Sequence, residues 1–204
     1  MNLIAPRVLL LVIGDGRDAL QRATLRSFYE SVHGYDLAEI VTVDDRHHLL
    51  GFCGAIRYGW QRIRETSATF EYVFHLEEDW RFDRPVHLGA MSDLLWTHPD
   101  VAQVALRRGK EPGEHAAPTD AWPEHFQDRD LDGSPYLLHR DFFTTNPSLY
   151  RRSLIHAYEW PEAPRCEGAF TETLKADGAM FAYWGSRLDE PWITHTGQRT
   201  GHGY

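Results

Sequence analysis

The stretch Val8-Leu-Leu-Leu-Val-Ile13, followed by Gly14-Asp-Gly16, decides the fold of this chain. An unbroken apolar run that ends in a glycine-rich turn predicts a parallel strand buried on both of its faces. Apolar residues at helical spacing follow over residues 17–33, and a second strand is expected at Ile40-Val-Thr-Val43. This alternation of strand and helix predicts an α/β fold with a doubly wound sheet.

The same alternation continues toward the middle of the chain. A helix is expected over residues 54–66 and a third strand over residues 72–76, which runs into Glu77-Glu-Asp79. All three expected strands end in acidic or Gly-Asp turns. Because ligands of doubly wound sheets bind beyond the carboxyl ends of the strands, we expect the functional site at this edge.

The second half of the chain is less regular. Helices are expected over residues 86–97 and 168–176, and strands over residues 101–106 and 180–184. Residues 109–139 are rich in Pro, Gly, His and Asp and are expected to form a long loop. A loop of that length inside a compact domain is usually a lid, a binding loop or a disordered segment.

Composition and charge narrow the class of protein. The chain has 204 residues, enough for one domain, and its net charge of −9 does not attract polyanions through the overall field. The longest apolar run is too short for a membrane span or a secretion signal, so we expect a cytoplasmic protein. Cys53 and Cys166 lack the spacing of a zinc site, and in a reducing cytosol we expect two reduced packing cysteines.

The strongest local motif is His75-Leu-Glu-Glu-Asp-Trp80. Carboxylates at the end of a buried strand are hard oxygen ligands for Mg²⁺ or Mn²⁺, which also bind substrate phosphates. The alternative is a solvated acidic turn that caps the next helix.

Two further turns carry carboxylates. Asp44-Asp45 follows the second strand, where a carboxylate can accept hydrogen bonds from a ribose, although a plain turn explains it equally well. Gly14-Asp-Gly-Arg17 lacks both the Lys-Ser/Thr pair of a P-loop and the spacing of a dinucleotide fingerprint. A kinase and a dinucleotide oxidoreductase are therefore disfavoured.

The carboxyl-terminal third adds a candidate base and a candidate ligand. Glu167 precedes an expected helix, where a carboxylate is stabilised by the helix dipole and can face the cleft, or merely cap the helix. His195 lies in His195-Thr-Gly-Gln-Arg199, in a glycine-containing tail that could close over a diphosphate. Arginine is well suited to phosphate recognition.

Short motifs occur in a fixed order along nearly the whole chain. They are Gly14-Asp-Gly-Arg17, Val43-Asp-Asp45, Gly51-Phe-Cys-Gly-Ala-Ile-Arg57, Phe74-His-Leu-Glu-Glu-Asp-Trp80, Cys166-Glu-Gly-Ala-Phe-Thr171 and His195-Thr-Gly-Gln-Arg199. With this order the chain resembles GT-A glycosyltransferases related to family 2, and among them the small stand-alone enzymes of actinobacterial phages. Residues 109–139 are the part least similar to them.

The resemblance implies a single Rossmann-like GT-A domain, in which a mostly parallel, twisted sheet is flanked by helices. It implies a half that binds the nucleotide-sugar over about residues 1–80 and a half that binds the acceptor over about residues 81–204. It also implies an inverting transfer of a hexose from a UDP-sugar to an acceptor hydroxyl, dependent on Mn²⁺ or Mg²⁺.

The resemblance also assigns roles to residues. Asp79 takes the metal-binding position of the DxD motif, and His195 that of the histidine that completes the metal site. Glu167 matches the second residue of the ED motif, the catalytic base, although Cys166 stands where the family has Glu. The residues that it places around the donor are Asp15, Arg17, Asp45, Arg57, Glu77, Glu78 and Arg199.

The acceptor is the least determined part of the function. Phage enzymes of this kind are expected to act on 5-hydroxymethylpyrimidines in DNA, and basic and aromatic side chains would bind such an acceptor. The alternatives are a virion protein and a small or glycan acceptor. The residues expected at the acceptor are Arg107, Arg108, Trp122 and Arg151, unless the arginines are only a solvated face and the aromatic residues core.

Two functions of other classes stay open. A nucleotidyltransferase shares the α/β sheet and the acidic site, but it needs a glycine-rich signature loop with a basic residue, which this sequence lacks. A non-catalytic module that binds a nucleotide-sugar would not need Glu167 as a base.

Overall fold

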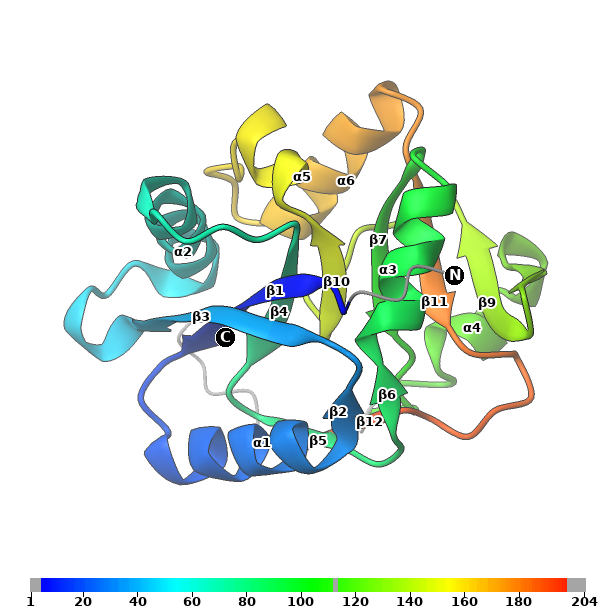
Figure 1. Cartoon of the computed structure of the whole chain (residues 1–204), viewed down its shortest axis with the longest axis horizontal. Helices are drawn as coiled ribbons and strands as arrows, with labels where there is room; N and C mark the ends of the chain where they lie inside the picture. Colours follow the sequence, from blue (N-terminus) through cyan, green and yellow to red (C-terminus); the bar gives the residue numbers. More distant parts are fainter. Residues whose placement is uncertain (1–4, 112–113, 198–204) are drawn as a thin grey trace.

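The computed structural model describes residues 5–111 and 114–197. Its centre is an eight-stranded sheet with the order β3-β1-β4-β10-β7-β11-β9-β8 (Figure 1). The strands of this sheet are β1 (Arg7–Gly14), β3 (Asp36–Asp44), β4 (Tyr72–Glu77), β7 (Val101–Leu106), β8 (Gln127–Leu131), β9 (Ser134–His139), β10 (Ser148–Arg151) and β11 (Met180–Trp184).

The sheet is mixed, and this corrects the expectation of a mostly parallel one. β1 pairs in parallel with β3 and β4, and β7 pairs in parallel with β11. Between these two groups lies β10, which is antiparallel to both β4 and β7. The chain returns to the centre of the sheet after β9, so a strand from late in the sequence separates the two parallel groups.

Helices cover both faces of the sheet (Figure 1). They are α1 (Asp18–Ser31), α2 (Gly51–Glu65), α3 (Leu88–Thr97), α4 (Pro118–Ala121), α5 (Arg152–Ala157) and α6 (Cys166–Ala176). α1 and α3 pack on one face through Phe28, Met91 and Leu94. α2, α5 and α6 pack on the other face, where Trp60 and Phe170 are buried.

The continuous apolar run of β1 follows from this layering. Val8, Leu10 and Val12 pack on the side of α1 and α3. Leu9, Leu11 and Ile13 pack on the side of α2. Because successive side chains of a strand point to opposite faces, a strand covered on both sides needs an apolar residue at every position.

The elements expected up to residue 106 are confirmed within a few residues. So are the later helix α6 and strand β11. The expectation of a long loop over residues 109–139 is wrong: the segment contains α4, a 3-10 turn at Pro123–His125 and the hairpin β8–β9. β8 lies at the edge of the sheet and four of its five residues are exposed. Its sequence is therefore polar and lacks the apolar pattern from which a strand is predicted.

The cysteines are bonded to each other, which corrects the expectation of two reduced thiols. Cys53 in α2 and Cys166 in α6 form a disulfide, with the Cα atoms 5.9 Å apart across a sequence separation of 113. The bond ties together two helices that pack on the same face of the sheet. Disulfides persist in oxidising surroundings, so the cysteines no longer support a cytoplasmic location.

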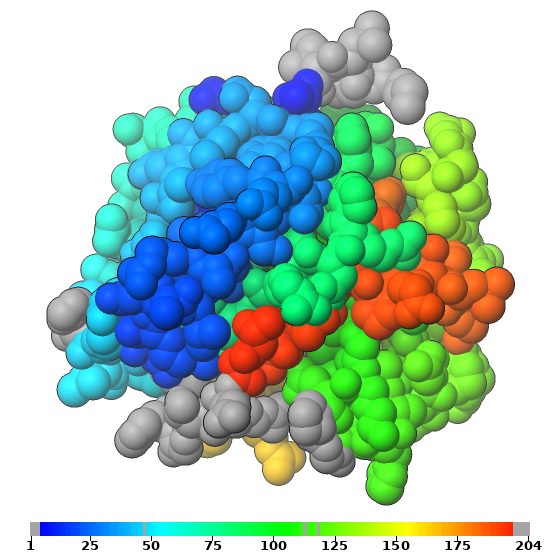
Figure 2. All heavy atoms as spheres, turned by 90° about the horizontal axis from the view of Figure 1, so that it is seen from below, coloured from blue at the N-terminus to red at the C-terminus, as the bar shows by residue number. Residues whose placement is uncertain are grey.

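Two short pairings complete the fold. β2 (Val32–His33) pairs with β6 (Val86–His87), and β12 (Ile193–His195) pairs with β5 (Trp80–Phe82). Figure 2 shows the residues of β12, in red, next to the blue residues of α1. No helix in residues 5–111 or 114–197 has the length and apolar character needed to cross a membrane.

Candidate functional site

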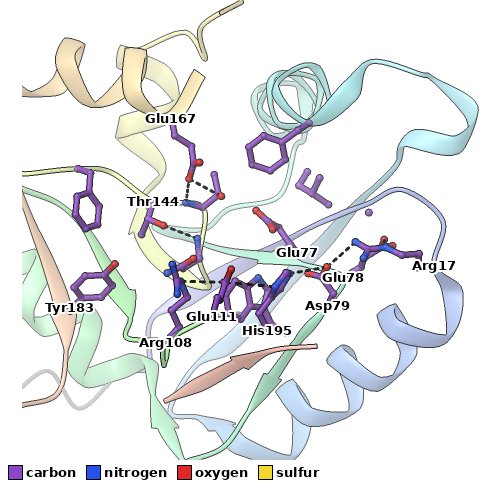
Figure 3. Close-up of a pocket in the computed structure, with 17 residues that line it drawn as sticks. Arg17, Glu77, Glu78, Asp79, Arg108, Glu111, Thr144, Glu167, Tyr183 and His195 are labelled. Atoms are coloured by element: carbon purple, nitrogen blue, oxygen red, sulfur yellow. Dashed lines mark hydrogen bonds and ion pairs between the residues drawn. The ribbon is translucent and has the colours of Figure 1, made fainter. Parts of the chain in front are cut away.

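A pocket of about 480 Å³ lies beyond the carboxyl ends of the central strands. Gly14 at the end of β1, Glu77 at the end of β4 and Tyr183 near the end of β11 contribute to its lining. Its volume falls in the usual range for small-molecule sites. In Figure 3, Arg17, Glu78 and Asp79 occupy one end of the pocket and Tyr183 the other, with Glu167 and Thr144 between them.

Arg17 joins three carboxylates at what we call the carboxylate end, formed by Arg17, Glu78, Asp79 and His195. Its Nε donates to Asp15 Oδ1 at 2.8 Å and to Glu78 Oε1 at 2.6 Å, and its Nη2 lies 2.9 Å from Asp79 Oδ2. Burial lowers the pKa of Arg17, but the carboxylates outweigh burial and raise it above its ordinary value. A permanently charged guanidinium therefore holds the turn after β4 against the turn after β1.

Asp79 and His195 form the second contact of this end. His195 Nε2 lies 3.1 Å from Asp79 Oδ2, and the Asp79 hydrogen bond raises the pKa of the imidazole. Burial raises the pKa of Asp79, but His195 and Arg17 outweigh it and bring that pKa below its usual range. The other oxygen, Asp79 Oδ1, is buried and has no hydrogen-bond partner among the described residues.

Glycines allow these groups to approach the backbone closely. A Cβ atom on Gly14 would collide with the Glu78 carboxylate, and one on Gly197 would collide with the carboxylate of Asp79. Gly197 would also bring its Cβ to 2.7 Å from Arg17 Nη1. Gly197 therefore packs directly on the Arg17–Asp79 pair, and a larger side chain at this position would displace that pair.

Glu77 lies between the two ends of the pocket. Burial, followed by the charges of Asp79 and Glu167, raises its pKa to about 8. Its Oε1 atom is buried without a hydrogen-bond partner in the described part of the chain. Glu77 is therefore largely protonated at neutral pH in this structure and can donate a hydrogen bond.

Glu78 differs from Glu77 because it has a cationic partner. Its carboxylate is buried, and burial raises the pKa of Glu78. The Arg17 guanidinium and the backbone N–H of Asp15 donate to Glu78 Oε1 and oppose that rise. Glu78 therefore serves to bind Arg17.

Glu111 was not anticipated from the sequence. Its Oε1 lies 3.8 Å from His195 Nδ1, on the side of the imidazole opposite Asp79. Arg108 contacts Glu111 at 3.4 Å and binds Glu114 through two hydrogen bonds of 2.8 and 2.7 Å. The Arg108 guanidinium thus helps to hold Glu111, which lines the pocket.

Glu167 lies in the first turn of α6, where the helix dipole favours a carboxylate. Both the backbone N–H and the hydroxyl of Thr145 donate to Glu167 Oε1, at 2.8 and 2.9 Å. Within the described residues, its second oxygen has no hydrogen-bond partner. Figure 3 shows the carboxylate pointing into the pocket, so the free oxygen can accept a proton from a bound molecule.

The structure places two of the expected donor residues elsewhere. Asp45 is buried and accepts hydrogen bonds from Leu50 N at 2.8 Å and Gly51 N at 2.9 Å, so it caps the start of α2. Arg57 forms an ion pair with Glu162 and does not line the pocket. Asp15 does not line the pocket, but it contacts Arg17 and Glu78 at its carboxylate end.

Of the expected acceptor residues, only Arg108 lines the pocket. Arg107 is buried beside it, outside the lining, and burial lowers its pKa. Trp122 is 52% exposed and also lies outside the pocket. Arg151 donates to the carbonyls of Val101 and His98, each at 2.9 Å, and so holds the end of α3. Arg199 lies outside the described residues.

Phe142, Asn146 and Tyr183 also line the pocket, and none of them is among the site residues expected from the sequence. Tyr183 lies in a strand whose five residues are all buried, so in sequence it reads as core. The segment 142–146 carries no recognisable motif. Only the turn that precedes β10 brings its side chains to the site.

Among the described residues, no group of three or more His, Cys, Asp or Glu side chains lies around one point where it could hold a metal ion. Asp79 and His195 are therefore a two-residue set, which a cation could use only together with substrate oxygens and water. Comparisons with models of protein families and with curated proteins return no match for this chain. The function must therefore be argued from the pocket itself.

Proposed function

We propose that the chain is a metal-dependent GT-A glycosyltransferase that moves a hexose from a nucleotide-sugar, UDP-linked in the first instance, to an acceptor hydroxyl. The observation that carries the proposal is the pocket itself. Asp79 and His195, which would bind the cation, contact each other at one end, and the hydrogen-bonded carboxylate Glu167 lies further along the same pocket. A metal-dependent transfer places a cation at the leaving diphosphate and a base at the acceptor hydroxyl within one site.

The fold supports the proposal at the level of the first three strands. β3, β1 and β4 are parallel neighbours, and the acidic turn Glu77–Asp79 follows the last of them. The pocket lies beyond their carboxyl ends, where α/β sheets bind ligands. The mixed second half of the sheet is compatible with the GT-A proposal but does not by itself support it.

The residues at the carboxylate end fit a divalent cation. Mg²⁺ and Mn²⁺ are commonly held by one or two protein side chains together with substrate phosphates. Asp79 Oδ1 is buried and unpartnered among the described residues, and His195 Nε2 faces the other oxygen of the same carboxylate. When bound, such a cation neutralises the charge that develops on the leaving diphosphate.

Arg17 would act on the donor in the same region. In this structure its guanidinium is shared by Asp15, Glu78 and Asp79. A cation at Asp79 would replace one of these contacts, which frees part of the guanidinium for a phosphate oxygen. Arginine binds phosphate through paired N–H donors.

Glu167 is the proposed base. It takes the proton from the acceptor hydroxyl while the hydroxyl oxygen forms a bond to the anomeric carbon. On the opposite face of that carbon, the bond to the diphosphate oxygen breaks and its electron pair leaves with the nucleotide. Thr145 holds Glu167 Oε1 through two hydrogen bonds, which leaves the second oxygen for this proton. The anomeric configuration inverts in such a displacement.

Glu167→Gln tests the proposal. It keeps an acceptor oxygen for Thr145 but removes the base, so transfer should fall at least about a hundredfold, the lower bound for general base catalysis. UDP binding in the presence of Mn²⁺ should stay unchanged. Glu172→Gln is the matched control, since Glu172 lies on the same helix but is exposed and paired with Lys175.

Unchanged transfer by Glu167→Gln would contradict the assigned base and favour a non-catalytic module that only binds a nucleotide-sugar. Asp79→Ala and His195→Ala should each weaken UDP binding only when Mn²⁺ is present. Equal affinity in both variants would contradict the metal site.

The acceptor first proposed, a 5-hydroxymethylpyrimidine in DNA, gains no support from the positions of the arginines. Arg107 and Arg151 lie outside the pocket, and Arg108 is bound by Glu111 and Glu114. A virion protein or a glycan stays an alternative acceptor. The side chains at the end of the pocket opposite Arg17 distinguish between a DNA acceptor and a glycan acceptor.

A further inference from the structure

The end of the pocket opposite Arg17 is aromatic. Phe142 and Tyr183 line it, with ring centroids 6.2 Å apart and an angle of 66° between the ring planes. Tyr183 is backed by His139, whose ring stacks on it at 5.4 Å and 19°. Burial lowers the pKa of His139 to about 3, so the group behind Tyr183 is neutral. We call Phe142 and Tyr183 the aromatic end.

The aromatic end is rigid because it belongs to the core. Phe126 packs against His139 at 4.9 Å and against Tyr183 at 6.0 Å. Phe142 contacts His139 at 5.0 Å and stays partly exposed, since it lies on the pocket side of the cluster. Because its neighbours already hold the Phe142 ring in place, that ring can pack on a ligand with little further loss of its own side-chain entropy.

Two neutral hydrogen-bonding groups accompany these rings. Neither the Tyr183 hydroxyl nor the Asn146 side-chain amide has a hydrogen-bond partner in residues 5–111 and 114–197, and both residues line the pocket. A hydroxyl can donate and accept, and an amide offers two donors and one acceptor. Glu167 lies between this end and the carboxylate end (Figure 3).

The charges of the pocket disfavour an anionic ligand at this end. Glu77, Glu111 and Glu167 contribute carboxyl groups to the lining. The guanidinium of Arg108 is held by Glu111 and Glu114, and that of Arg17 is held by three carboxylates. At the aromatic end, then, no arginine of the described lining is left uncommitted for the phosphates of a polynucleotide, whose binding depends on such cations.

We infer that the aromatic end binds an uncharged carbohydrate ring, whose C–H face packs on the partly exposed Phe142 ring and whose hydroxyls bond to Asn146 and to the hydroxyl of the buried Tyr183. A sugar ring matches this lining because it has an apolar face and a rim of hydroxyls. One of those hydroxyls then faces Glu167. That this sugar is the acceptor rests on the proposed function, whereas the binding of the ring does not.

The test measures sugar binding without requiring transfer. Saturation-transfer NMR is recorded with methyl β-D-glucopyranoside and methyl β-D-galactopyranoside as probes, on the full chain with UDP and Mn²⁺ present. Phe142→Ala should weaken binding of the responding glycoside by up to about tenfold, the most that a single aromatic contact contributes. Tyr183→Phe removes only the hydroxyl and should weaken the same signal without affecting the packing.

Trp96→Ala is the control, because Trp96 is an aromatic residue on α3 that is 78% exposed and lies outside the pocket. It should bind the glycoside as the unchanged protein does. A short duplex that carries 5-hydroxymethylcytosine is titrated in parallel at low and high salt.

The outcomes separate this inference from the proposed function. Glycoside binding that depends on Phe142 and Tyr183 supports the inference, even if UDP fails to bind and the transferase proposal falls. Binding of UDP with Mn²⁺ but of neither glycoside overturns the inference and leaves the transferase proposal in place. Binding of the modified duplex alone, weakened by salt, likewise overturns it, and binding of no probe overturns both.

Discussion

At the scale of single residues, Glu77 should make the stability of the fold depend on pH. It is a carboxyl group with a raised pKa of about 8, and it lies within a set of acidic neighbours. The unfolded chain loses this proton near its ordinary pKa of about 4.3. Between these two pH values the unfolded state binds fewer protons than the folded state. The free energy of unfolding therefore falls as the pH rises.

Replacing Glu77 by Gln should remove this dependence. From pH 6.5 to pH 7.5, the unchanged chain should lose about 1 kcal/mol of unfolding free energy relative to Glu77→Gln. Urea unfolding at each pH measures it. Glu172→Gln, an exposed site, should show no such growth. Parallel pH profiles for Glu77→Gln and the unchanged chain would mean that Glu77 is already ionised in the folded state.

Glu111 is the residue whose role the structure adds. If His195 Nε2 binds the cation, its Nδ1–H is left to face Glu111 Oε1, which lies 3.8 Å away. Carboxylates in this position orient metal-binding histidines, and their loss typically weakens metal affinity by about 10–100-fold. Glu111→Gln should therefore weaken Mn²⁺ binding in the presence of UDP by about tenfold.

The affinity for Mn²⁺ can be followed by the electron paramagnetic resonance of the free ion. Glu124→Gln is a suitable control, because Glu124 is exposed and does not line the pocket. An unchanged Mn²⁺ affinity in Glu111→Gln would show that this carboxylate does not orient His195.

At the scale of elements, the disulfide sets the position of α6. Cys166 immediately precedes Glu167, and Cys53 immediately follows Phe52, which also lines the pocket. The double substitution of Cys53 and Cys166 by Ser should lower the free energy of unfolding by about 2–4 kcal/mol. Transfer should fall further than UDP binding, since the first turn of α6 carries the base.

Reduction provides the control for this change. Dithiothreitol should lower the stability of the unchanged chain toward that of the Ser double variant and leave the variant itself unaffected. If the reductant changes neither protein, the bond contributes nothing to stability.

The elements that were predicted well are those with local signals. The period of Ile56, Trp60 and Ile63 defines the buried face of α2. The edge strand β8 has no such pattern, because most of its side chains face solvent. Similarly, β10 is only four residues long, and its pairing with β4 and β7 follows from contacts distant in sequence.

At the scale of the whole molecule, a bound nucleotide should stabilise the fold. A ligand at a hundred times its dissociation constant adds about 2.7 kcal/mol to the free energy of unfolding. Each kcal/mol should raise the melting temperature of a chain of this size by roughly 2–4 °C. We expect one of UDP, GDP, ADP and TDP, with UDP favoured, to raise it, and only with Mn²⁺.

Asp79→Ala should abolish that rise, while Trp96→Ala should preserve it. A rise in melting temperature with a nucleotide but without metal would support nucleotide binding and contradict the metal-binding role of Asp79 and His195. If none of the four nucleotides raises the melting temperature, the nucleotide-sugar donor is contradicted.

The sequence by itself determined the layered α/β character and the edge at which the site lies. A strand covered on both faces must be apolar throughout, as β1 is. The acidic residues that follow β4 come directly after it in the sequence, so their place at the end of that strand could be predicted. The candidate residues Asp79, Glu167, Arg17 and His195 were likewise visible as short motifs, because each motif needs only a few neighbouring residues.

Only the tertiary structure decided which of these groups meet. The pairing of Cys53 with Cys166 and the approach of Glu111 to His195 join residues that are far apart in the sequence. Local periodicity follows from backbone geometry within a few residues, whereas these contacts depend on the packing of the whole chain. For the same reason, the aromatic end of the pocket is recognisable only once β11 and the turn before β10 lie side by side.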